Sequence, residues 1–502
     1  MRVCLVWKLS AAAGLLVHMT AAAGETVAPD IGGRLEMFVD RFLIERLDNT
    51  VLHLHEPRDE GEVLRYDAPW EGNFCAYNTV IYDGTRYRLY YRGKRQHSAD
   101  GVSEVTCYAE SSDGRVWLKP KLGLHEASGT RDNNIILAVA GITHNFSPFL
   151  DTRPGVPPGE RFKALGGVQN VGGGLYALVS ADGIRWKKLQ EKPVMTRGAF
   201  DSQNVAFWSA TEQRYVACFR TFTKGITDAN VWKPAGLRSI SRADSTDLIT
   251  WSDPVPTMFD PPQDVHLYIS QTHPYFRAPH VWVATAARFM QGRRALTEEE
   301  ATALKVPKGY SQDVSDSVLL TSRDGRTYQQ TFREALIRPS LRLSEWVSRT
   351  GYPALNVVPT GPAEMSLYVN QDYTLPTAHL RRYSMRLDGF ASVRAPYEGG
   401  EMTTIPLRFK GNQLVLNFAT SAAGAIRVEI QDSAGKALPG FAAADCVELL
   451  GNRLAMPVRW KQGGDLSALA GKPIRLRFVM KDADLYALQF ILQGAGSNTP
   501  IH

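Results

Sequence analysis

Ser111-Ser112-Asp113-Gly114-Arg115-Val116-Trp117 is the first copy of a short repeat that decides the fold. The pattern returns as Ser180-Ala181-Asp182-Gly183-Ile184-Arg185-Trp186 and as Ser245-Thr246-Asp247-Leu248-Ile249-Thr250-Trp251. A fourth copy is Ser322-Arg323-Asp324-Gly325-Arg326-Thr327-Tyr328, and Arg386-Leu387-Asp388-Gly389-Phe390 is a weaker fifth. Such regular spacing of a turn motif indicates a repeat architecture.

Each copy has the chemistry of a tight turn, because Asp-Gly adopts positive φ angles and the aromatic residue after it anchors the returning strand. Upstream of the first copy, Tyr77–Asp83, Arg86–Arg92 and Val105–Ser111 read as strands, which gives about four strands per unit. Five such units predict an all-β fold with a five-bladed β-propeller over residues 35–398. A sandwich built from unrelated hairpins is the alternative, and four copies in register argue against it.

Two segments depart from the repeat. Residues 291–309 look helical, which predicts an insertion between strands of blade four. Residues 400–497 lack the repeat and contain short alternating strands, so they predict a separate C-terminal β-sandwich. The expected strands are Asn412–Phe418, Ile426–Ile430, Pro457–Trp460, Ile474–Val479 and Tyr486–Leu492.

The first 23 residues resemble a cleaved secretory signal peptide. Arg2 and Lys8 make the start basic, Leu9–Thr20 is mostly apolar, and Ala21-Ala22-Ala23 offers small residues to a signal peptidase. An uncleaved anchor is the alternative, but the apolar stretch is shorter than the roughly 20 residues that cross a bilayer. The prediction is therefore a secreted or periplasmic protein.

Composition points to a soluble protein without metal or cofactor. The chain is 44% hydrophobic and 22% charged, and its net charge of +6 is spread without a Lys/Arg run, so neither nucleic acid nor a membrane is an expected partner. No Cys-x-x-Cys or His-x-x-x-His pair predicts a metal site. After removal of Cys4 with the signal, Cys75, Cys107, Cys218 and Cys446 are expected to be buried free thiols.

Candidate catalytic residues lie where the innermost strand of each blade begins, because these strands face the channel of a propeller. Hydrolysis of a glycosidic bond needs two carboxyl groups, one as proton donor and one ionised. Glu71 and Asp201 are the first choice, and Asp40 is a third carboxylate near the start of the propeller. The alternative role for Glu71 and Asp201 is pairing with Arg277 or Arg349, and for Asp40 pairing with an arginine.

Polar and aromatic residues of the same segments are expected to bind a sugar, by hydrogen bonding or by ring stacking. They are Trp70, Asn78, His144, Asn145, Gln203, Asn204, Tyr275, Arg277, His280, Arg349 and Tyr352.

In layout the chain resembles the five-bladed propeller glycoside hydrolases of families 32, 43, 68, 117 and 130. Family 32 is the most similar, because its members also carry a C-terminal β-sandwich, like Gly471–Phe478 with Asp482–Tyr486 here, and Ser245–Trp251 has a form typical of those propellers. The resemblance implies a hydrolase acting on oligo- or polysaccharide with carboxylate acid/base catalysis in a central pocket.

The catalytic motifs of family 32 are absent. No Asn-Asp-Pro-Asn, Arg-Asp-Pro or Glu-Cys sequence occurs, so the nucleophile, acid and fructose specificity are not carried over. Some family 117 members are thought to use a histidine as acid, which keeps His144 and His280 as candidates for that role.

Two other functions compete with the glycosidase. A catalytically silent glycan-binding propeller would use the same carboxylates to hold sugar hydroxyls. A sialidase-like enzyme is suggested by the likeness of the repeat to the sialidase Asp box, but sialidases have six blades, and the five units found here argue against it.

Overall fold

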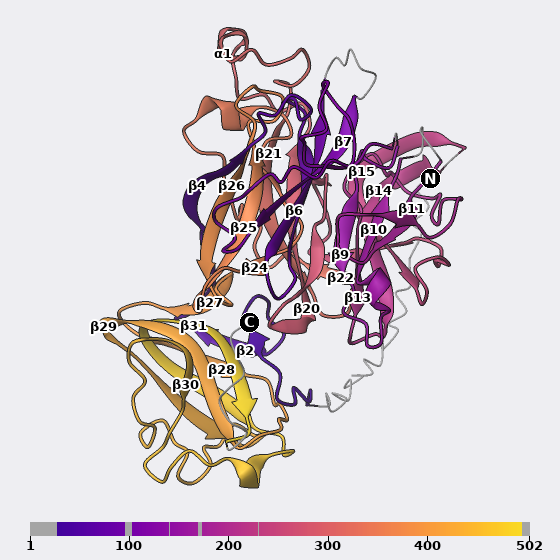
Figure 1. Ribbon diagram of the computed structural model, residues 1–502. Coiled ribbons are helices and arrows are strands. Elements are labelled where there is room, and N and C mark those ends of the chain that lie inside the picture. The colour runs from indigo at the N-terminus through magenta and orange to yellow at the C-terminus, as the bar shows by residue number, and fades with distance from the viewer. Residues whose placement is uncertain (1–27, 96–102, 140, 169–172, 229, 494–502) are drawn as a thin grey trace, which may run out of the picture.

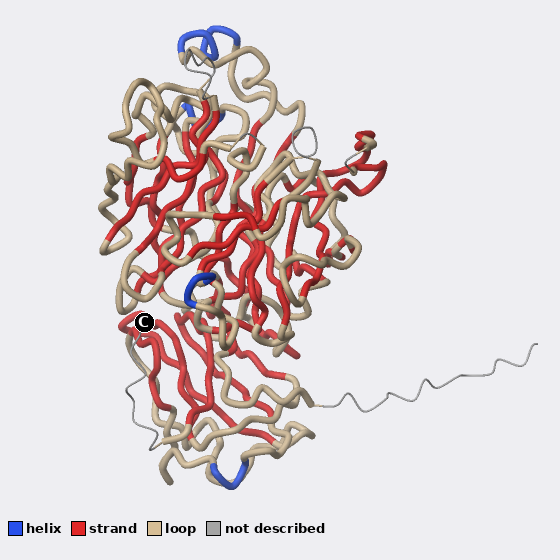
Figure 2. Tube along the Cα trace, turned by 45° about the vertical axis from the view of Figure 1, so that its right-hand side comes forward, coloured by secondary structure: helices blue, strands red, loops and turns tan. Residues whose placement is uncertain are grey.

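The computed structural model describes residues 28–95, 103–139, 141–168, 173–228 and 230–493, and the predicted signal peptide lies outside these ranges. Within them nearly all regular structure is β-strand (Figure 2). The predicted all-β fold is confirmed: the chain forms a five-bladed β-propeller and a β-sandwich, which occupies the lower left of Figure 1.

Apart from one parallel strand pair in blade four, each blade is an antiparallel sheet whose first strand lies nearest the channel. The first strands β5, β9 and β13 contact one another in order, β13 contacts β19, and β24 contacts β5. Blade one is β5 (Ala76–Tyr82), β6 (Tyr87–Lys94), β7 (Glu104–Ser111) and β8 (Ile135–Leu137); blade two is β9 (Ser147–Leu150), β10 (Phe162–Gly166), β11 (Tyr176–Ser180) and β12 (Lys187–Lys188); blade three is β13 (Val205–Ser209), β14 (Arg214–Thr227), β15 (Trp232–Ser245) and β16 (Val255–Pro256).

Blades four and five deviate from this plan. Blade four contains β17 (Met258–Asp260), β18 (His266–Leu267), β19 (Thr272–Tyr275), β20 (Ala278–Met290), β21 (Val314–Ser322) and β22 (Thr327–Gln329). Blade five contains β23 (Tyr352–Pro353), β24 (Val358–Pro359), β25 (Glu364–Gln371) and β26 (His379–Arg386), and its outer strand is β4 (Arg58–Arg65) from the N-terminal part of the chain. In Figure 1 the indigo β4 lies beside the orange β26, which closes the ring of blades.

The four strong repeats form the same turn after the third strand of blades one to four, as the repeat predicted. In the first copy Ser111 Oγ donates to Asp113 Oδ1 and accepts from Gly114 N, and Asp113 Oδ1 also accepts from the N–H groups of Arg115 and Val116. The other three copies repeat these bonds. The repeated residues are therefore structural.

These turns also bind the preceding blade. Tyr368 of blade five donates to Gly114 O at 2.6 Å, and Arg88 of blade one donates to Asp182 O at 2.8 Å. In the third copy, where leucine replaces glycine, Leu248 keeps a φ of 68° and its fully buried side chain packs against Phe149 of blade two. The repeat thus links neighbouring blades as well as neighbouring strands.

A substitution of the glycine in the fourth turn tests this packing. Gly325 has a φ of 63°, and a Cβ there would overlap the buried Trp282 ring and the Arg242 guanidinium. We expect Gly325→Ala to lower the free energy of unfolding by about 2–4 kcal/mol, since positive φ and overpacking each cost roughly 1–3 kcal/mol. Gly292→Ala, at a φ of 71° with no atom within 4 Å of the new Cβ, is the matched control and should cost only about 1 kcal/mol. Equal losses in urea denaturation would contradict the contact.

The sandwich sheet draws strands from both ends of the chain. It contains β1 (Glu36–Met37), β2 (Ile44–Asp48), β3 (Val51–Leu54), β27 (Ala391–Ala395), β28 (Gly400–Thr404), β29 (Gln413–Gln431), β30 (Asn452–Pro457) and β31 (Arg475–Ile491). The expected boundaries at residues 35 and 400 therefore differ from the structure: the propeller strands run from β4 to β26, and β1, β2 and β3 pair with β31, β28 and β27.

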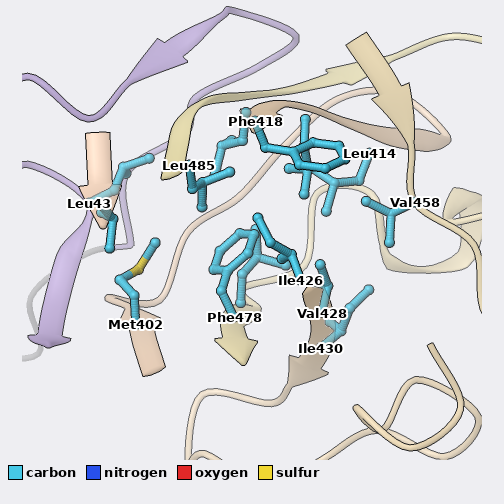
Figure 3. Packing of buried hydrophobic residues seen from close by; sticks show 14 of the residues in the cluster. Leu43, Met402, Leu414, Phe418, Ile426, Val428, Ile430, Val458, Phe478 and Leu485 are labelled. Atoms are coloured by element: carbon cyan, nitrogen blue, oxygen red, sulfur yellow. The ribbon is translucent and has the colours of Figure 1, made fainter. Parts of the chain in front are cut away.

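The sandwich has its own apolar core, in which Leu43 from the N-terminal segment packs with Met402, Phe418, Val428 and Phe478 (Figure 3). The strands expected separately at 412–418 and 426–430 are two arms of the single strand β29, whose pairing with β31 shifts register between Thr420 and Ala425. Likewise, the strands expected at 474–479 and 486–492 merge into β31. Between the arms, Ala419, Thr420 and Ala425 still pair with β31, so a break in the apolar pattern did not mark a strand end.

Two smaller predictions are confirmed. The helix α1 (Glu298–Ala303) begins with a capping box between Thr297 and Glu300 and lies between β20 and β21 of blade four. Cys75, Cys107, Cys218 and Cys446 are buried free thiols. In the described ranges, no helix has the length and apolar character needed to cross a membrane.

Candidate active site

Residues from blades one, two, three and four meet at the end of the channel where the first strands begin. In an antiparallel blade, the start of the first strand, the end of the second and the start of the third lie at the same end. We call the residues that meet there the His144 cluster: Tyr77, Arg92, Glu104, His144, Asp201, Arg220 and Tyr268.

His144 lies between two carboxylates. Its Nε2 atom is 2.8 Å from Asp201 Oδ1 and its Nδ1 atom is 2.8 Å from Glu104 Oε1. The three residues come from three successive blades: Glu104 begins β7, His144 precedes β9, and Asp201 precedes β13. Both ring nitrogens therefore face a carboxylate oxygen, and both can donate at once only when the imidazole is protonated.

Both carboxylates are held in the ionised form. Burial by itself raises the pKa of Asp201, but the hydrogen bond with His144 and the charge of Arg220 lower it to about 2. For Glu104 burial also raises the pKa, and the contact with His144 and the charge of Arg92 lower it to about 2. The Asp201 side chain is 55% exposed whereas that of Glu104 is 18% exposed, so Asp201 is the carboxylate that solvent or a substrate reaches.

Two buried arginines lie close to the carboxylates of Glu104 and Asp201. Arg92, at the end of β6, donates to Phe74 O and to the Tyr373 hydroxyl, and lies 3.7 Å from Glu104 Oε1. Arg220, in β14, lies 4.0 Å from Asp201 Oδ2 and donates from Nε to Ala199 O. The arginines are fixed by backbone and tyrosine groups, and this arrangement favours ionised carboxylates in front of them.

The loop that carries Asp201 is fixed by two asparagines. Asn145 Nδ2 donates to Phe200 O at 2.6 Å and to Ser202 O at 2.8 Å, and Asn204 Nδ2 donates to the same two carbonyl oxygens. Asn145 and Asn204 are both buried, so they serve as positioning residues for Asp201 rather than as sugar ligands.

Side-chain amides from different blades form a buried hydrogen-bond network. Gln271 Nε2 donates to Gln203 Oε1 at 2.7 Å, and Gln203 Nε2 donates to Thr79 Oγ1 at 2.9 Å. Asn78 accepts from Tyr66 and donates to Asn370. Gln203 and Asn78 are 1% exposed, so the structure places these two predicted sugar ligands in a buried amide network and not at a solvent-exposed surface.

The structure brings Arg349 and Tyr352 to the same end as Asp201. The Tyr352 ring is 5.2 Å from the Tyr268 ring, and the Arg349 guanidinium is 5.8 Å from the centre of that ring. Tyr77 and Arg349 both have left-handed backbone, with φ of 57° and 63°. Non-glycine residues in this conformation store strain, and such residues gather at functional sites.

The predicted pairing of Glu71 with Asp201 is not formed. Glu71 is fully buried and is bonded to Ala68 N, Tyr91 and Lys119 Nζ, none of which contacts Asp201. Burial raises the pKa of Glu71 although the Lys119 charge opposes it. Glu71 precedes the start of β5 by five residues, so it turns back into blade one instead of facing the channel. Trp70 in the same loop donates to Asn134 Oδ1 and is structural.

The other predicted residues of blade four lie elsewhere. Tyr275 ends β19 and Arg277 lies in the turn after it, so they are at the opposite end of the channel from Asp201, which precedes its strand. Both bind the buried Asp388, at 2.9 and 2.6 Å. His280 Nε2 is 3.2 Å from Glu36 Oε1. Asp40 is paired with Arg323 at 2.7 Å, which fixes the N-terminal segment to the turn of blade four.

Sequence reasoning missed Glu104, Arg92 and Arg220. It considered only the starts of first strands, whereas Arg92 and Arg220 lie on second strands and Glu104 begins a third. The expected strand order could have pointed to these residues. In an antiparallel blade, the end of the second strand and the start of the third lie at the end where the first strand begins.

The depressed pKa of Glu104 predicts a loss of stability in acid. A carboxyl group with a folded-state pKa of about 2, below its usual 4.5, stabilises the fold above the usual value and loses that contribution as pH falls towards about 2. We expect Glu104→Gln to lose less unfolding free energy than the wild type between about pH 5 and about pH 3. Urea denaturation measures this, with the 86% exposed Glu191→Gln as control. The same pH slope in all three proteins would contradict the ion pair.

In the part of the chain that the structure describes, no group of three or more His, Cys, Asp or Glu residues is arranged to hold a metal ion. The His144 cluster presents a histidine between two carboxylates, exposes one ionised carboxylate to solvent, and places arginines where they can stabilise negative charge. These are the elements of acid/base chemistry on a polar substrate.

A scan against protein-family models finds no match, and a search of curated proteins finds no significant match. Among solved structures, an N-acetylgalactosamine deacetylase from F. plautii is 14% identical, covers 68% of this chain and 96% of its own, and has a TM-score of 0.43. A family 43 arabinoxylan arabinofuranohydrolase from Bacillus subtilis is 11% identical with coverages of 84% and 96% and a TM-score of 0.37. A fructofuranosidase from Schwanniomyces occidentalis is 9% identical, with coverages of 87% and 98% and a TM-score of 0.38. The function is therefore argued from the site's own residues.

Proposed function

We propose that this protein is a glycoside hydrolase that acts at the His144 cluster. The observation that carries the proposal is the series of close contacts from Glu104 through His144 to Asp201, assembled from three blades at the end of the channel. A propeller brings distant parts of the chain together at this position, and an ion-pair series with an exposed carboxylate is suited to acid/base work.

The residues divide into two catalytic roles. Asp201 is ionised at neutral pH because of its pKa of about 2, so it acts on water as a base or stabilises the positive charge that develops at the anomeric carbon. His144 is the proton donor to the leaving oxygen, in the role that a protonated carboxyl has in most glycosidases, and a bound sugar has to replace the contact of its Nε2 atom with Asp201 for this transfer. Glu104 holds the imidazole in place through Nδ1.

Hydrolysis assays on a broad panel test this proposal. The panel contains aryl glycosides of both anomers, together with plant, algal and microbial oligosaccharides, and product release by the wild-type protein is the expected result. If oligosaccharides bind in calorimetry but none is cleaved, the glycosidase proposal is wrong and the alternative of a glycan-binding propeller replaces it.

We also propose that residues 1–23 direct export of the chain. Its support is the basic start, the apolar stretch and the Ala21-Ala22-Ala23 site in the sequence. Sequencing the N-terminus of the exported protein should give Gly24 as the first residue, and an intact Met1 on protein outside the cytoplasm would rule cleavage out.

A further inference from the structure

Beside the His144 cluster, three arginines surround one tyrosine ring. The guanidinium carbons of Arg220, Arg238 and Arg349 lie 4.9, 5.4 and 5.8 Å from the centre of the Tyr268 ring. Arg220 and Arg238 come from β14 and β15 of blade three, and Arg349 comes from the segment before β23 of blade five. Cation–π contacts with Tyr268 hold each arginine at the same place, although like charges repel one another.

Two of these charges lack a counterion. Arg220 is 4.0 Å from Asp201 Oδ2, but among the described residues no carboxylate oxygen lies within 4.0 Å of Arg238 or Arg349. The Nε atoms of both arginines are buried and have no hydrogen-bond partner in the same part of the chain. Burial and the neighbouring charge of Arg220 lower the pKa of Arg238, which reports the crowding of positive charge.

A buried guanidinium without a counterion is costly unless a ligand supplies the negative charge. Elsewhere the protein pairs arginines of restricted exposure: Arg242 binds Glu212 and Asp244, and Arg323 binds Glu36 and Asp40. Arg238 and Arg349 are half-buried, share the ring of Tyr268 with Arg220, and so bring two unpaired charges beside the residue that contacts the exposed Asp201.

We propose that Arg220, Arg238 and Arg349 form an anion subsite around Tyr268, which selects a sugar bearing a carboxylate or a sulfate ester. Guanidinium groups bind both anions through paired N–H donors, so the shared chemistry is a negatively charged group with several acceptor oxygens. The inference rests on the proposed function in taking the ligand to be a sugar, and it adds the class of that sugar. Because Arg220 contacts both Tyr268 and Asp201, the anionic group would lie on the sugar at which the bond is cleaved, or next to it.

Matched pairs of oligosaccharides test the charge requirement. One arm compares oligogalacturonides with their carboxyl-reduced counterparts, and the other compares sulfated galactan oligosaccharides with their desulfated counterparts. Binding is measured by calorimetry and cleavage by product analysis, for the wild type, Arg349→Gln, Arg349→Lys and the control Arg185→Gln. Arg185 is suited as control because it lies in the turn of blade two and its side chain is 72% exposed.

The expected result is that in one arm the charged sugar binds the wild type at least about tenfold more tightly than its neutral counterpart, since only the charged sugar forms charge-assisted hydrogen bonds with the guanidinium donors. Arg349→Gln should remove that preference, Arg349→Lys should keep part of it, and Arg185→Gln should keep all of it. The arm that shows the preference identifies the anion as carboxylate or sulfate.

Equal affinity of the wild type for charged and neutral sugars in both arms, or no binding at all, would overturn the anion subsite. A preference that survives in Arg349→Gln would overturn it as well. If charged sugars bind in an Arg349-dependent way and no bond is cleaved, the subsite stands and the glycosidase proposal fails. If neutral sugars are cleaved as fast as charged ones, the glycosidase stands and the subsite fails.

Discussion

We expect Asp201→Asn to lower kcat on a glycoside that the wild type cleaves by about 10³-fold or more, because in the proposed mechanism the neutral amide cannot stabilise the positive charge of the transition state or activate water. The loop should keep its shape, since Asn145 and Asn204 hold the carbonyl oxygens of Phe200 and Ser202 without using the Asp201 side chain. Substrate affinity and the midpoint of thermal unfolding should therefore change little, while steady-state kinetics show the loss in kcat.

Asp132→Asn is the matched control for this substitution. Asp132 is 70% exposed and pairs with one cation, Lys121, at 2.9 Å, so it has a similar environment away from the His144 cluster. Its kcat should stay within about twofold of the wild type, as expected for a surface ion pair. If Asp201→Asn retained wild-type turnover, Asp201 would not be catalytic and the site would have to be sought elsewhere.

Replacing Lys119 by methionine lowers the free energy of unfolding by about 3–5 kcal/mol, because it leaves the fully buried Glu71 without its cation. Lys119 Nζ is 2.8 Å from Glu71 Oε2 and also donates to Arg65 O. The Lys119 side chain therefore covers the buried carboxylate and supplies its counterion. Chemical denaturation measures the loss. The double variant Lys119→Met/Glu71→Leu should recover most of it, since no charge then remains buried.

Glu71→Gln separates the structural role of this residue from the catalytic role expected from the sequence. Because the contacts of Glu71 lie within blade one, the folded variant should keep kcat within about twofold of the wild type. A loss of several powers of ten in a folded Glu71→Gln protein would restore the pairing of Glu71 with Asp201 and contradict the placement described above.

The blades were predictable from sequence because their signal is local. Ser, Asp and Gly within a few residues determine each turn by hydrogen bonds that the structure repeats, as at Asp113 and Asp324. The outer strand of blade five could not be predicted in this way. β4 pairs with β26 more than 300 residues away, as in the pairing of Arg65 with His379. Neither strand has a sequence feature that identifies the strand with which it pairs.

The site was predictable in part for the same reason. His144 and Asp201 were found because they precede first strands, whereas Glu71 was misplaced because the strand after it begins only at Ala76. Whether a polar residue before a strand turns towards the channel depends on the loop conformation, and burial against Lys119 decided it here. The loops, and not the repeat, determine which charges meet.

The pairing of early strands with late ones has a consequence for how the protein is made. During synthesis β1 to β4 are made first, yet their partners are β26 to β28 and β31, which are completed only after residues 379–491 are made. Until then both the propeller and the sandwich have a strand edge without its partner. Contacts between residues so far apart in the sequence make folding slow. The nascent chain can complete neither the propeller nor the sandwich until these late strands are made, so it stays incompletely folded while most of it is translated. Truncation before β26 should therefore leave a species that chaperones and proteases recognise, rather than a closed propeller.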